Sequence, residues 1–90
     1  MGYKEVEIDV TVKEHFGMVA PHVHQRVGHK FENPHVEKAW AEKVGHHDWL
    51  YWVHVKTGHL GNHHHFTIVY EIRHHEVKLI DVHEGHKTFF

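Results

Sequence analysis

The sequence predicts an α+β fold in which two helices pack on one face of a four-stranded, mainly antiparallel sheet, in the order β-α-α-β-β-β. Three patterns predict this: alternating apolar and charged residues near the N-terminus, apolar residues at helical spacing in the middle, and renewed alternation toward the C-terminus. Ninety residues with an apolar fraction of 40% are enough for one small core. We therefore expect a single domain spanning residues 1–90.

The first element is expected to be a strand over residues 3–15. Apolar and polar side chains alternate there without interruption, which is typical of a strand with one face in water. The apolar positions are Val6, Ile8, Val10 and Val12, and the polar ones are Glu5, Glu7, Asp9, Thr11 and Lys13. Gly17 is expected to end this strand.

Two helices are expected next. In residues 20–31 the apolar side chains Val23, Val27 and Phe31 recur every four residues behind Pro21, which suits a first helical turn. For the second helix, Asn33 and Pro34 form a typical N-terminal signal and Gly45 a typical end. Its apolar stripe would consist of Val36, Ala39, Trp40 and Val44.

The remaining chain predicts three strands over residues 49–56, 64–73 and 77–84. A two-residue loop at His74-His75 would pair Ile72 with Val77, Glu71 with Lys78, Tyr70 with Leu79 and Val69 with Ile80. Both loop residues would then need positive φ. The same register places Phe66 opposite His83 and His65 opposite Glu84. It also puts Asp81 on one face with Ile68 and Leu79, as a partly buried carboxylate near His83.

Composition excludes several functions. The chain has no cysteine and no serine, which rules out disulfides, thiolate metal sites and a Ser-His-Asp triad. Ten Lys and Arg against twelve Asp and Glu provide no strong electrostatic footprint, so nucleic acid is not expected to bind at neutral pH. No apolar run has the length of a membrane span and no secretory signal is visible. We expect a soluble protein without a membrane partner, cytoplasmic in its expression host if it is engineered.

Histidine accounts for 16 of the 90 residues. Neutral imidazole is the commonest protein metal ligand, and histidine titrates near physiological pH. Adding sixteen positive charges to the net charge of −2 would give +14 in acid. On the predicted strands the best metal site comprises His54, His63, His65 and His83, with Glu84 or His86 nearby. Zinc, nickel or copper would suit such a site, and no organic cofactor is indicated.

These patterns favour a small histidine-rich scaffold, designed or engineered, that binds transition metals or responds to pH. One alternative is a self-assembling or partner-binding module that uses the strand at residues 3–15 and the terminal Phe89 and Phe90. The other is enzymatic. Two helices followed by an antiparallel sheet ending in residues 66–84 resemble, in element order, the small ribonuclease toxins of the RelE/ParE kind. That resemblance implies RNA cleavage, for which Arg73, Lys78 and Lys87 would be the available cations, and imidazole acid–base hydrolysis would involve His83 or His54.

Overall fold

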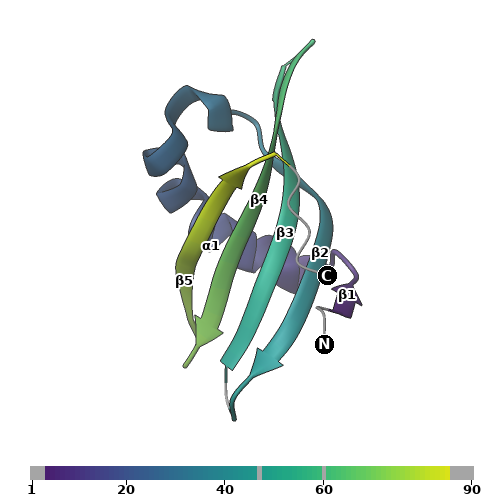
Figure 1. The fold of residues 1–90 in the computed structure, drawn as a ribbon, viewed down its shortest axis with the longest axis vertical. Coiled ribbons are helices and arrows are strands. Elements are labelled where there is room, and N and C mark those ends of the chain that lie inside the picture. The colour runs from purple at the N-terminus through teal and green to yellow at the C-terminus, as the bar shows by residue number, and fades with distance from the viewer. Residues whose placement is uncertain (1–3, 47, 60, 86–90) are drawn as a thin grey trace.

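A computed structural model describes residues 4–46, 48–59 and 61–85, and it shows one helix lying across a five-stranded antiparallel sheet (Figure 1). The strands follow one another in chain order, each hydrogen-bonded to the next. The α+β class and the antiparallel sheet are confirmed, whereas the expected two helices and four strands are wrong. The elements are β1 (Lys4–Val6), α1 (Val10–Val27), the 3-10 helix η1 (Gly28–Phe31), β2 (His35–Val44), β3 (Asp48–His59), β4 (Asn62–Arg73) and β5 (Glu76–Glu84).

The helix α1 begins inside the segment expected to be the first strand and takes up its residues 10–15, while only Lys4–Val6 form a strand there. Asp9 caps it, because the carboxylate Oδ1 accepts a hydrogen bond from the Val12 amide at 3.0 Å. The buried side chains are Val12, Phe16, Val19 and Val23, which follow the spacing of one helical face. This stripe continues past Gly17, which was expected to end the strand, and past Pro21, which was expected in a first helical turn and lies in the helix interior. Burial of the stripe outweighs the low helix propensity of those two residues.

Residues 35–44 form the strand β2, so the expected second helix is wrong. The register against β3 shifts between Val36 and Lys38, which makes Glu37 the extra residue of a β-bulge. A bulge changes the face on which later residues lie, so Val36 and Ala39 pack in the same core although they are three residues apart. That spacing imitates a helix. Asn33 has φ 50° and precedes a strand, so it caps no helix.

The hairpin between β4 and β5 turns at His74 and His75, as expected, with φ of 50° and 66°. The first three predicted pairs, from Ile72–Val77 to Tyr70–Leu79, are confirmed. Beyond them the expected register is wrong, because a bulge at Ile80 pairs Val69 with Asp81.

The shifted register also changes the far end of β5. His83 lies opposite Thr67, and Glu84 opposite Phe66. Asp81 is exposed and shares a face with Val69, not with Ile68. The partly buried carboxylate expected at Asp81 is therefore not present.

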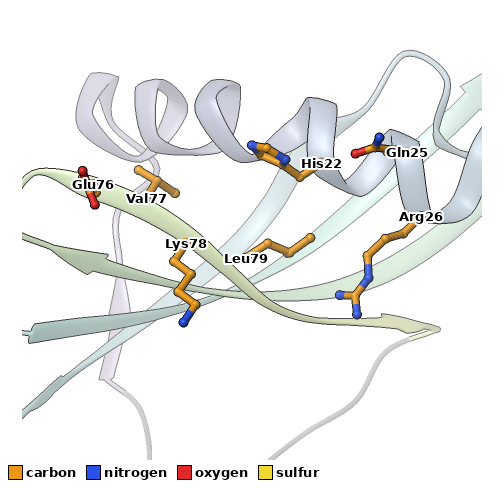
Figure 2. A pocket seen from close by; sticks show the side chains of 7 residues that line it. All are labelled: His22, Gln25, Arg26, Glu76, Val77, Lys78 and Leu79. Carbon is orange, nitrogen blue, oxygen red and sulfur yellow. The ribbon is translucent and has the colours of Figure 1, made fainter.

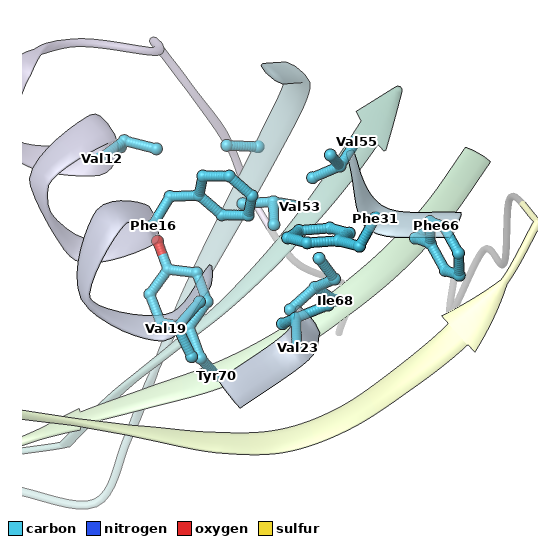
Figure 3. Close-up of a cluster of buried hydrophobic side chains, with 11 residues drawn as sticks. Val12, Phe16, Val19, Val23, Phe31, Val53, Val55, Phe66, Ile68 and Tyr70 are labelled. Carbon is cyan, nitrogen blue, oxygen red and sulfur yellow. The ribbon is translucent and has the colours of Figure 1, made fainter. Parts of the chain in front are cut away.

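The two faces of the sheet differ in what covers them. The covered face packs against α1 and η1 and contains the main core, drawn in Figure 3. Edge-to-face ring contacts join α1 to η1 and η1 to β4, with centroids 6.0 Å apart for Phe16–Phe31 and 5.9 Å for Phe31–Phe66. The open face, opposite the helix, has a second apolar cluster of Trp40, Trp52 and Val69. No helix in the described part of the chain is long and apolar enough to span a membrane.

Candidate functional site

The structure places the four histidines expected to bind metal on the open face. His54 pairs with Thr67 across β3 and β4, and Thr67 pairs with His83 across β4 and β5. The two imidazoles therefore flank Thr67 from neighbouring strands. His65 and His63 lie two and four residues before Thr67 on β4, and alternation puts them on the same face.

These four histidines nevertheless differ in their surroundings. His54 is only 8% exposed, and its ring meets the Trp40 ring edge-on at 4.6 Å. His65 Nδ1 lies 3.9 Å from Glu37 Oε1 at the bulge of β2. His63 and His83 are exposed.

Among the described residues, no three His, Asp or Glu side chains are arranged to hold one metal ion. The four-ligand site thus stays a prediction. His86, expected as a nearby ligand, lies outside the described residues, as do Phe89 and Phe90.

A different histidine, His15, lies at the interface between the helix and the sheet. Its ring approaches two tyrosine rings of the covered face edge-on, with centroids 5.4 Å from Tyr51 and 6.3 Å from Tyr70. The tyrosines are paired across β3 and β4, and their rings stack with centroids 5.2 Å apart and planes 5° apart. We call these three side chains the His15 site.

Two polar atoms of the His15 site are buried without a hydrogen-bond partner among the described residues. They are His15 Nδ1 and the hydroxyl of Tyr70. A buried polar atom without a partner destabilises a fold, since water satisfied it in the unfolded chain. Such an atom also disfavours any charge placed next to it, because nothing there stabilises that charge.

The pKa values of the site follow this burial. Burial lowers the pKa of His15 below its ordinary value, and the carboxylates of Glu14 and Asp9 oppose that shift to a smaller extent. Burial also raises the pKa of Tyr70, with a further contribution from Tyr51. The pKa of Tyr51 is raised by burial first and by Asp9 second. All three groups are thereby held in their neutral forms at pH 7.

Sequence reasoning placed residue 15 at the end of the expected strand over residues 3–15 and missed this site. The available signal was the helix start at Asp9. Once the helix begins there, His15 falls between Val12 and Val19 at spacings of three and four residues, on the flank of the buried stripe. The site could therefore be found from the sequence only after α1 had been correctly placed.

Comparisons with known proteins give no relative: no family model, curated protein or solved structure matches the chain. The resemblance to ribonuclease toxins depended on two helices preceding the sheet. The observed order has a single α-helix between β1 and β2. That resemblance therefore supports no function for this chain.

Proposed function

We propose that this chain is a histidine-rich, pH-responsive domain in which acid weakens the packing of α1 on the sheet. The observation that carries the proposal is the position of His15 against two stacked tyrosines, with Nδ1 buried and without a hydrogen-bond partner in the described part of the chain. A proton on this imidazole would place a positive charge in an apolar interface. The folded state accordingly resists protonation more than the unfolded chain does.

The direction of the pH effect follows from the lowered pKa of His15. Above the ordinary histidine pKa of about 6.5, His15 is neutral in both states and the fold keeps its full stability. As the pH falls, the unfolded chain takes up the proton first, which favours unfolding. The loss of stability due to His15 begins below its ordinary pKa and is complete once the pH has fallen through its lowered folded-state pKa.

The other histidines act in the same direction by a different route. The net charge is −2 with every imidazole neutral, and sixteen added protons would bring it to +14. Repulsion among so many like charges destabilises a compact state and is weakened by salt. The surface contribution is therefore salt-dependent, whereas the contribution of the partly buried His15 depends less on salt.

Matched substitutions on one helix test the proposal. His15→Gln removes the titrating group at the interface, and His24→Gln removes an exposed imidazole from the same helix. Urea unfolding is measured for wild type and both variants at several pH values between 7.5 and 5. We expect wild type and His24→Gln to lose stability together in acid, and His15→Gln to lose distinctly less. Equal acid sensitivity in all three proteins would contradict the proposal.

Transition metals are a second candidate ligand, supported by the positions of His54, His65 and His83 around Thr67. Since the described residues contain no three-ligand set, we expect nickel or zinc to bind weakly through one or two imidazoles. A nickel titration at pH 7.5, followed by the melting temperature, tests this. His65→Asn should reduce the shift more than His24→Asn does. A shift equally reduced by both variants would mean dispersed binding and no site on the open face.

A further inference from the structure

The edge of the sheet at β5 forms a groove with α1. The groove has a volume of about 530 Å³, and its walls are residues 76–79 of β5 and, from α1, His22, Gln25 and Arg26 (Figure 2). Figure 2 shows the helix running above the strand, with His22 over Leu79. The groove lies at the β5 edge of the sheet and shares no residue with the His15 site, although its Leu79 pairs with Tyr70 on β4.

One wall of this groove is a strand edge that no other described strand pairs with. β5 pairs with β4 and is the last strand of the sheet. The outer edge of such a strand presents N–H and C=O groups that an added strand can use. The bulge at Ile80 interrupts the regular edge, so the usable part is residues 76–79. These are the same four residues that line the groove.

The charges around the groove are mainly positive. Arg26 and Lys78 are exposed, and neither makes an ion pair with a described residue. Figure 2 shows Arg26 reaching from the helix past Leu79, whereas Lys78 points away from the helix. The two cations thus lie on opposite sides of the strand edge. Of the described residues that form the groove wall, Glu76 is the only carboxylate, and it lies at the other end of the groove.

We propose that this groove binds an extended acidic segment of a partner protein, which adds to the sheet as a further strand beside β5. Main-chain hydrogen bonds to residues 76–79 would hold the segment, and its side chains would alternate between the two sides of the edge. The residue of the segment opposite Leu79 would then lie beside the guanidinium group of Arg26. Its neighbour, opposite Lys78, would lie beside the Lys78 ammonium group. The next residue would contact Val77.

This arrangement specifies the chemistry of the segment. Two consecutive acidic residues followed by an apolar one match the two cations and Val77 in order. A nucleic acid is a poorer match, because Arg26 and Lys78 are the only permanent cations among the described residues of the groove and Glu76 opposes them. The inference goes beyond the pH response proposed above, since it involves neither His15 nor its tyrosines.

A labelled peptide tests the groove directly. The probe is an acetylated octapeptide with the core Glu-Glu-Val flanked by threonines, titrated with the full chain and followed by fluorescence anisotropy. One control peptide has Gln-Gln-Val as its core, and a second carries N-methyl groups on alternate residues along the edge that would pair with β5. We expect the probe to bind and both control peptides to bind at least about threefold more weakly, the size of one exposed charge contact.

Matched variants locate the binding. Arg26→Gln and Lys78→Gln should each weaken binding of the probe by about threefold. Lys43→Gln removes an exposed cation from β2, which is three strands away from β5 in the sheet, and should leave binding unchanged. Equal weakening by Lys43→Gln would indicate attraction to net charge alone and overturn the proposal. N-methylated peptide that binds as well as the probe would also overturn it, since no strand is then added.

Two further outcomes would reject the groove as a peptide site. One is the absence of probe binding to wild type at about 1 mM, the weak end of specific recognition. The other is a stable dimer, seen by light scattering, that the probe does not dissociate. In that case a second copy of the chain, and not a partner peptide, would occupy the β5 edge.

Discussion

The two faces of the sheet differ in how much apolar surface they bury and in where their histidines lie. The covered face packs against α1, and together they form the main core, which includes Val12 of the helix and Tyr70 of the sheet. The open face has the smaller cluster around Trp52 and a loose group of histidines near Thr67. The number of histidines on a face therefore does not determine how strongly burial shifts their pKa values. One imidazole on the covered side, His15, has its pKa lowered by burial.

The same contrast applies to binding. A metal needs several ligands converging on one point, and strand geometry on the open face separates His54 from His83 by the whole width of β4. A strand edge needs only its backbone and a few side chains at alternating positions. The groove at β5 meets this simpler requirement, so it is a better defined binding surface than the histidine-rich region.

Matched isoleucines give the largest expected difference between a core position and a surface position. Ile68 is fully buried on the covered face, and Ile80 is 43% exposed at the bulge of β5. We expect Ile68→Ala to lower the unfolding free energy by about 3–4 kcal/mol, because it leaves a cavity in the core. Ile80→Ala should cost less than about 1 kcal/mol. Urea unfolding at pH 7.5 measures both, and comparable losses would show that the covered face is not the main core.

Glycine substitutions test how β3 is anchored at the end of the covered face. Gly58 has φ 101°, its amide donates to Glu32 O at 2.6 Å, and an added Cβ would collide with the Asn62 carbonyl oxygen. Gly58→Ala should therefore destabilise by about 2–3 kcal/mol. Gly45→Ala is the control, with φ 74° and open space around its Cβ, and it should cost about 1 kcal/mol. A smaller effect at Gly58 than at Gly45 would contradict the close approach.

The buried Tyr70 hydroxyl of the His15 site is tested by removing it. Tyr70→Phe keeps the stacked ring and removes an oxygen that is buried without a partner among the described residues. We expect it to raise the unfolding free energy by about 1 kcal/mol. Tyr51→Phe, at a partly exposed ring, should change stability by less than about 0.5 kcal/mol. Destabilisation by Tyr70→Phe would mean that the hydroxyl is satisfied after all.

The sequence predicts those parts of the fold in which the physical rules agree with one another. At the β4–β5 hairpin, cross-strand pairing and alternation agree, and both the turn and the first pairs are confirmed. Where two rules conflict, the prediction is wrong. In β2 the bulge at Glu37 converts alternation into helical spacing. In α1 the interior Pro21 conceals a buried stripe that is otherwise regular.

The candidate site was harder to predict than the fold for a related reason. The dense run at residues 63–65 attracts attention in the sequence, yet a strand sends neighbouring imidazoles to opposite faces. The effect of a histidine depends on burial, which only tertiary packing decides. His15 becomes notable once α1 places it over Tyr51 and Tyr70.

The turn at His74 and His75 belongs to neither face of the sheet and gives the smallest expected effect. Both residues are exposed with positive φ, a conformation that asparagine and glycine adopt more readily than histidine. Replacing His74-His75 by Asn-Gly should therefore raise the unfolding free energy by about 0.5–1 kcal/mol. The gain should be the same at pH 7.5 and 5.5 if these imidazoles are merely turn residues, and urea unfolding at both values measures it. A gain confined to acid would instead mean that charge repulsion at the turn contributes to the pH response, and that the surface histidines share this function with His15.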